Sequence, residues 1–186
     1  MTGIALLMAL VVVMQFISGI IPPVAGFPIS LVLVPIVLGS AMYGISGGAI
    51  LGAVFGIIVY INCVNGMDPG GAMVFQASPV LCFLVVMGKG ILAGVAAGAV
   101  YKLLKNRNGY LAMLLAAIVC PVVNTGTFIV CMLLFFKDIL AAWANGGDIA
   151  AYILSGLILV NFVPELIINV VFSPVLQRVY HIINRK

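Results

Sequence analysis

Residues 79–104 read PVLCFLVVMGKGILAGVAAGAVYKLL, a nearly uninterrupted apolar run. Between Pro79 and Tyr101 its sole charged side chain is Lys89. A bilayer has a hydrocarbon core about 30 Å thick, which a helix of about 20 apolar residues can cross. The stretch is long enough, and its apolar residues do not alternate with polar ones as in a barrel strand. It therefore predicts a transmembrane helix.

The rest of the chain has the same character. Of its 186 residues 65% are hydrophobic and only 6% are charged, whereas a soluble domain is about 25% charged. So few charges cannot cover a surface that faces water, and lipid must be the main solvent. Backbone polar groups in lipid have to be satisfied internally, which favours helices. We therefore expect an all-α membrane protein with a single transmembrane domain over residues 1–186.

Long apolar runs predict six membrane-spanning helices joined by polar or Gly/Pro-rich segments. They cover roughly residues 3–20, 30–43, 48–62, 79–104, 110–136 and 149 to beyond 174. We expect loops over residues 21–28, 44–47, 63–78, 105–108 and 137–148. No basic segment precedes the first run and no cleavage site follows it, so we expect a membrane helix there and not a cleaved signal peptide.

The basic residues predict the orientation. With six spans, one side of the membrane carries Lys102, Lys105, Arg107, Arg178, Arg185 and Lys186 and no carboxylate. The other side carries Lys137 against Asp68, Asp138 and Asp148. Short cytoplasmic loops are enriched in Lys and Arg, so we expect both termini in the cytoplasm.

Polar side chains at membrane depth are the first candidates for function, because they are costly in lipid and usually face the interior of a bundle. Asn161, Glu165 and Asn169 repeat every four residues and share one face of their helix. The full set of candidates within the membrane is Lys89, Asn124, Thr125, Thr127, Asn161 and Glu165. They predict a pocket for a polar solute between the helices at 79–104, 110–136 and 149–174.

Two interpretations of these residues stay open. In the first, the amides and hydroxyls bind a polar solute and Lys89 meets its carboxylate. In the second, Lys89 and Glu165 form a buried ion pair, and the asparagines join helices through hydrogen bonds. The two are compatible, since such a pair can form the floor of a pocket.

Three residues outside the spans are further candidates. Asn65, Gln76 and Trp143 lie in the outer loops and could close over a ligand, with Trp143 stacking on it. A single Trp near a helix end is also typical of an anchor at the membrane interface. Both interpretations of Trp143 stay open.

Several chemistries are not expected. The four cysteines, Cys63, Cys82, Cys120 and Cys131, form no CxxC pair and are predicted to be small apolar fillers. The single His, His181, lies in the tail, and no HExxH, Ser/His dyad or pair of aspartates lies at membrane depth. A GxxxxGK[ST] phosphate loop is absent as well. We therefore expect no enzyme, metal, cofactor or nucleic-acid partner, and any ATP hydrolysis must come from a partner protein.

The whole chain resembles the substrate-binding S component of an energy-coupling-factor (ECF) vitamin transporter, in length, in expected spans and in the order of its motifs. Residues 30–57, SLVLVPIVLGSAMYGISGGAILGAVFGI, are similar to the hairpin of the second and third helices in that family. Asn124-Thr125 resembles an Asn-Thr of the pantothenate-like branch, and Asn161 with Glu165 matches its Asn-x-x-x-Glu pattern. Lys89 stands where that branch commonly has Arg, so the charge is retained without the bidentate geometry.

The resemblance implies a function. An S component captures a water-soluble vitamin from outside, with pantothenate as the first expectation here. It delivers the vitamin by toppling in the membrane, together with a coupling subunit and two cytoplasmic ATPases, in the plasma membrane of a prokaryote. Ala5 and Ala9 match the Ala-x-x-x-Ala motif of the first helix, which docks onto the coupling subunit in that family; packing within the chain would explain these small residues equally well.

Other readings remain open. Folate, riboflavin, a thiamine precursor or another micronutrient could replace pantothenate, and a cationic solute would favour Glu165 as its contact. A stand-alone secondary transporter or channel could use Lys89 and Glu165 as a proton relay, although the two halves of the chain show no inverted repeat. A purely structural membrane protein would leave the polar stripe without a ligand.

Overall fold

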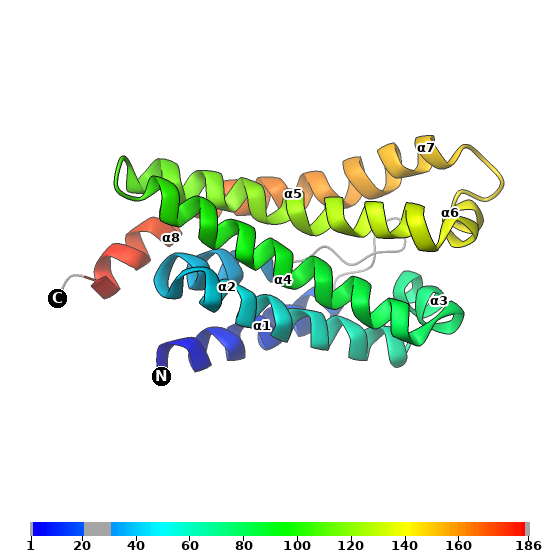
Figure 1. Cartoon of the computed structure of the whole chain (residues 1–186), viewed down its shortest axis with the longest axis horizontal. Coiled ribbons are helices and arrows are strands. Elements are labelled where there is room, and N and C mark those ends of the chain that lie inside the picture. The colour runs from blue at the N-terminus through cyan, green and yellow to red at the C-terminus, as the bar shows by residue number, and fades with distance from the viewer. Residues whose placement is uncertain (1, 21–30, 185–186) are drawn as a thin grey trace.

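The computed structural model describes residues 2–20 and 31–184, and all regular elements in these ranges are helices (Figure 1). The helices are α1 (Thr2–Ile20), α2 (Leu33–Val64), α3 (Pro69–Ala77), α4 (Pro79–Leu104), α5 (Gly109–Phe135), α6 (Lys137–Trp143), α7 (Ile149–Tyr152) and α8 (Val163–Asn184). A π-helical segment, η1 (Ile153–Phe162), joins α7 to α8.

Four helical stretches in the described ranges are long and apolar enough to cross a membrane. They are Leu33–Val64, Pro79–Leu104, Gly109–Phe135 and Ile149–Ile183, and Gly3–Gly19 is a shorter apolar helix. The prediction of an all-α membrane protein is confirmed. The segment 21–28, predicted to be a loop, lies outside the described residues.

The chain reverses direction at Gly44, inside α2. This residue has φ 72° and ψ −161°, a conformation that glycine adopts without a steric penalty. A side chain at Gly39 would run into Leu51, although twelve residues of continuous helix would separate the two positions by about 18 Å. Figure 1 shows the two arms of α2 side by side. The predicted turn between two helices is confirmed.

The second arm of α2 packs directly against α4 through glycines. A Cβ atom at Gly52 would lie 2.6 Å from the carbonyl carbon of Gly90, and one at Gly48 would lie 2.7 Å from that of Gly94. The Ser40 hydroxyl of the first arm donates a hydrogen bond to the Gly94 carbonyl (3.0 Å). The two backbones touch, as small residues four apart permit.

Two segments that the sequence predicts to be loops contain short helices. In the segment 63–78, Asp68 is the N-cap of α3 and accepts a hydrogen bond from the Gly71 amide (3.0 Å), with Pro69 in the first turn. The Asp-Pro pair predicts a turn and a helix start equally well. In the segment 137–148, α6 forms around the fully buried Leu140. Both loop predictions are wrong over these helices.

The bundle has two distinct ends. The start of α1, the end of α8 and the α4–α5 connection lie together at one end, and α3 and α6 lie at the other (Figure 1). At the first end the rings of Tyr101 and Tyr180 are 5.4 Å apart between centroids. The first arm of α2, from Leu33 to Tyr43, has eleven residues and is about 16 Å long, which is short for a span.

Candidate functional site

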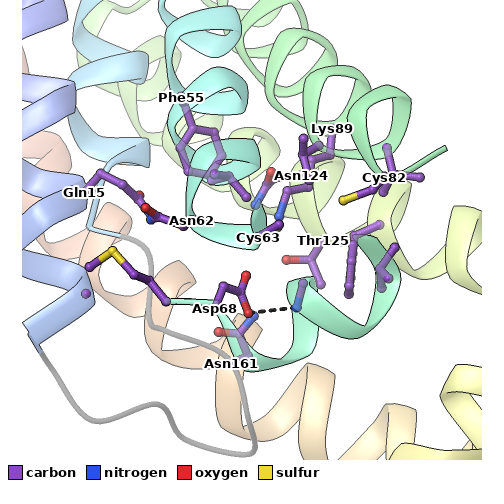
Figure 2. A pocket seen from close by; sticks show the side chains of 18 of the residues that line it. Gln15, Phe55, Asn62, Cys63, Asp68, Cys82, Lys89, Asn124, Thr125 and Asn161 are labelled. Carbon is purple, nitrogen blue, oxygen red and sulfur yellow. Dashed lines mark hydrogen bonds between the residues drawn. The ribbon is translucent and has the colours of Figure 1, made fainter. Parts of the chain in front are cut away.

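A cavity lies inside the bundle near the end that carries α3 (Figure 2). Its walls come from α1, the second arm of α2, the α2–α3 connection, α3, α4, α5, η1 and α8. The polar and charged residues in these walls are Gln15, Asn62, Asp68, Lys89, Asn124, Thr125, Asn161 and Glu165. Polar groups from both halves of the chain therefore converge on one enclosed space.

Five candidates from the sequence meet in this cavity. They are Lys89, Asn124, Thr125, Asn161 and Glu165. Asn124 and Thr125 are buried, with 5% and 6% of their surface exposed, and Glu165 is 2% exposed. The expected pocket between the helices at 79–104, 110–136 and 149–174 forms only part of the site, because α1, α2 and α3 complete its walls.

The other four candidates lie outside the cavity walls. Thr127 is half-buried on α5, and Asn65 and Gln76 are exposed at the ends of α2 and α3. The Trp143 indole N–H donates to the Met73 sulfur (3.2 Å), and its ring lies 6.3 Å from that of Tyr152. These contacts join α6 to α3 and α7 over the same end of the bundle.

Three polar wall residues were missed in the sequence. Gln15 is a polar residue inside the first apolar run, so the rule that intramembrane polar side chains face the interior already marks it as a candidate. Asn62 is the last residue of the helix predicted over 48–62, and Asp68 lies in the loop predicted over 63–78; polar residues are ordinary in both places. The return of α3 toward the bundle brings its N-cap, Asp68, to the cavity.

Lys89 supplies the one ammonium among the described wall residues. Its Nζ atom lies 5.0 Å from the ring centre of Phe128 and 5.7 Å from that of Phe55. Both distances are within the range of cation–π attraction, which stabilises a cation partly removed from water. The ammonium is therefore held at the cavity wall near two aromatic rings.

Three amide oxygens in the walls accept no hydrogen bond from the described residues. They are Gln15 Oε1, Asn124 Oδ1 and Asn161 Oδ1, all buried. Buried polar atoms almost always have a partner, in the protein or in bound water or ligand. These oxygens therefore suit a solute that carries hydroxyl or amide N–H donors.

Asp68 connects the cavity to α3. Its carboxylate caps the helix at the Gly71 amide and also lines the cavity. Burial raises the pKa of this carboxyl group above its usual value, while the Gly71 hydrogen bond and the charge of Lys89 act in the opposite direction. The protonated form of Asp68 is therefore more populated than in an exposed aspartate.

The polar stripe of the last helix has a structural role as well. The Asn169 side chain donates to the Glu165 backbone carbonyl (2.8 Å), one turn earlier. Asn169 is fully buried and does not line the cavity. The stripe thus combines two wall residues, Asn161 and Glu165, with Asn169, which forms a hydrogen bond within its own helix. Asn161 lies in the π-helical segment η1, a geometry that is frequent at functional sites.

The cavity is small as it stands. Measured as the space open to the centre of a water-sized sphere, its volume is about 60 Å³. One water needs about 10–15 Å³ on this measure, so roughly four to six waters fit. A larger solute requires wall side chains to move.

Comparison with known proteins identifies the family of the chain. The family profile described as "ECF transporter, substrate-specific component" matches residues 1–176. The chain is also 28% identical over 181 residues to the pantothenic acid transporter PanT of Lactococcus lactis subsp. cremoris (strain MG1363), covering 91% of this chain and 87% of that protein. The chain therefore belongs to the family of substrate-specific components of ECF transporters, and is a multi-pass cell-membrane protein of vitamin transport and not an enzyme.

Proposed function

We propose that this protein captures pantothenate in the cavity beside α3 and delivers it to the cell interior. The observation that carries the proposal is the composition of the cavity, with one ammonium and three buried amide oxygens that lack hydrogen-bond donors. The similarity to the pantothenic acid transporter PanT supports the choice of solute.

The chemistry of pantothenate fits these groups. The molecule has a carboxylate at one end, an amide in the middle and two hydroxyls at the other end. The carboxylate would bind Lys89, since a charge-assisted hydrogen bond is about twice as strong as a neutral one. The hydroxyl and amide N–H groups would donate to Asn124, Asn161 and Gln15. Because the molecule is larger than the present space, Met67 and other wall residues of the α2–α3 connection would move outward to admit it.

Delivery would depend on partner proteins. We propose that the chain acts with a transmembrane coupling subunit and two cytoplasmic ATPases, because its own sequence has no phosphate-binding loop. In this proposal the chain has six spans, counting the two arms of α2 separately. The termini and the basic α4–α5 connection face the cytoplasm, and the cavity opens toward the outside at the α3 end.

Thermal unfolding of the purified chain with a panel of water-soluble vitamins tests the capture step. A solute that binds only the folded state raises the melting temperature. We expect pantothenate alone to do so, and we expect Asn161→Ala to abolish the rise. Asn65→Ala is the matched control, because Asn65 is exposed and outside the cavity walls.

Two results would overturn the proposal. Stabilisation by a different vitamin would replace pantothenate as the cargo. Equal loss of the shift in Asn161→Ala and Asn65→Ala would place the binding site elsewhere. Co-purification with the coupling subunit and ATPases separates delivery by an ECF complex from stand-alone transport.

A further inference from the structure

Two cysteines that are far apart in the sequence meet in the wall of the cavity. Cys63 belongs to the second arm of α2 and Cys82 to the first turn of α4. The α2–α4 contact that pairs Gly52 with Gly90 and Gly56 with Val86 brings these two positions close together, and both side chains line the cavity (Figure 2). They are free thiols, 2% and 1% exposed. The cavity thus offers a route from the outer end to a pair of adjacent thiols.

The pair lies directly beneath α3. A side chain at Gly71, in the first turn of α3, would run into the Cys63 sulfur. The chain between the two cysteines contains all of α3 and the α2–α3 connection with Met67, whose wall residues we propose move to admit solute. A covalent bond between the thiols would therefore close this segment into a loop at its base.

We propose that Cys63 and Cys82 form a dithiol site that reacts with small sulfur electrophiles, namely low-molecular-weight disulfides and thiosulfonates, and closes to a disulfide joining α2 to α4. The two thiols line the same cavity, and closure of the disulfide brings their sulfurs to the S–S bond length of about 2.05 Å. The dithiol site does not depend on which solute the cavity binds, so this inference goes beyond the proposed function.

The reaction balances with the electrophile as the oxidant. The first cysteine loses its proton to water and attacks the sulfur of the reagent, whose S–X bond breaks and whose X group leaves as an anion. The second cysteine then attacks the protein sulfur of the mixed disulfide and expels the reagent's thiolate. The two protein sulfurs lose two electrons in total, and the two released protons are taken up by the two leaving groups or by water.

Methyl methanethiosulfonate is a suitable probe because it is smaller than pantothenate. Its first step releases methanesulfinate and its second step releases methanethiol. The experiment treats the full chain in detergent or nanodiscs and maps unreduced peptides by mass spectrometry. We expect one disulfide between Cys63 and Cys82, with a net loss of two hydrogens, that dithiothreitol reverses.

Variants provide the controls. Cys63→Ser should carry a methylthio adduct on Cys82 and no disulfide. A double variant, C120S/C131S, should cross-link as the wild type does, because Cys120 and Cys131 do not line the cavity. If a cysteine variant fails to fold, the peptide map of the treated wild-type chain alone tests whether the Cys63–Cys82 disulfide forms.

The outcomes are distinguishable. Methylthio adducts on both Cys63 and Cys82 without a disulfide, or no reaction at either residue in the folded chain, would overturn the dithiol site. Slower cross-linking with pantothenate present would support both the dithiol site and pantothenate in the cavity. Cross-linking at an unchanged rate with pantothenate would support the dithiol site and count against pantothenate as the cargo.

Discussion

Lys89 shows how one residue sets the chemistry of the cavity. It is an ammonium at membrane depth, a position that usually has a functional cause, and its charge lies between Phe55 and Phe128. A neutral amide at this position would keep a polar group and remove the charge. Lys89→Gln therefore separates attraction for an anion from general polarity.

We expect Lys89→Gln to weaken pantothenate binding strongly. A hydrogen bond to a charged group contributes about 1.5–3 kcal/mol, which corresponds to a roughly tenfold to hundredfold higher Kd. Isothermal titration of the purified variant measures this change. Lys89→Arg should retain most of the affinity, and Lys102→Gln, an exposed lysine outside the cavity, should retain all of it. Unchanged affinity in Lys89→Gln would remove Lys89 from the site.

Asp68 predicts a dependence of stability on pH. Burial raises its pKa in the folded protein above the value of about 3.9 in an unfolded chain. Between these two values the folded state binds more protons than the unfolded state, so stability falls as pH rises from about 4 through the folded pKa. This fall should be visible as a lower melting temperature and should be absent in Asp68→Asn.

The Asn variant is chosen because it retains a good N-cap for α3. Asp148→Asn is the matched control: Asp148 also caps a helix, by accepting from the Ala150 amide (3.0 Å), but it is exposed. Its melting curve should follow that of the wild type across the pH range. A pH profile of Asp68→Asn identical to the wild type would contradict a role for Asp68 burial.

The sequence identifies many wall residues but cannot place all of them. Lys89, Asn124 and Asn161 stand out because a polar residue in an apolar run has few explanations. Asp68 does not stand out, because an aspartate before a proline is ordinary in a surface turn. Only the contact of α3 with the bundle, which depends on long-range packing, makes Asp68 a wall residue. The proximity of Cys63 and Cys82 also depends on long-range packing, in this case of α2 against α4.

At the scale of the elements, the contact between α2 and α4 positions the cavity. These helices carry Cys63 and Cys82 and hold Phe55 against Lys89. Their backbones touch at Gly52 and Gly90, where no side chain fits between them. Gly90, Gly94 and Gly98 are four apart in the sequence, a spacing that predicts close packing of this helix face, but the spacing alone does not identify α2 as the partner.

We expect Gly52→Ala to destabilise the protein. The new Cβ would lie 2.6 Å from the Gly90 carbonyl carbon and 3.0 Å from the Ile91 nitrogen, both in the backbone of α4. Overpacking of this kind typically costs about 1–3 kcal/mol. A thermal melt in detergent should show a lower midpoint than the wild type.

Gly88→Ala provides the matched control in α4, since a Cβ at Gly88 would meet nothing within 4 Å. Alanine favours a helix over glycine by up to about 1 kcal/mol, so this variant should be as stable as the wild type or slightly more stable. Equal melting points for Gly52→Ala and Gly88→Ala would mean that α2 and α4 separate readily at this contact.

In the whole molecule, the two ends of the bundle have different proposed roles: one binds the solute and the other faces the cytoplasm. The cavity, α3 and α6 occupy one end, and the termini and the α4–α5 connection occupy the other (Figure 1). The charge pattern in the sequence predicts this polarity, because basic residues gather in short cytoplasmic segments. The number of spans is less accessible to such reasoning, since the first arm of α2 is short and folds back within a continuous apolar run.

The surface of α1 predicts how the bundle meets a partner. Ala5 and Ala9 are both exposed and one helical turn apart, so they form a flat strip that another helix can approach. We expect the double variant A5L/A9L to bind pantothenate with unchanged affinity, because neither residue lines the cavity. Co-purification with the coupling subunit should fall sharply, because two leucine side chains would hold the partner's backbone away. Ala151→Leu, an exposed alanine in another apolar helical stretch, should co-purify as the wild type does. Full recovery of the complex with A5L/A9L would exclude this strip as the docking surface and direct attention to the other exposed faces of the bundle.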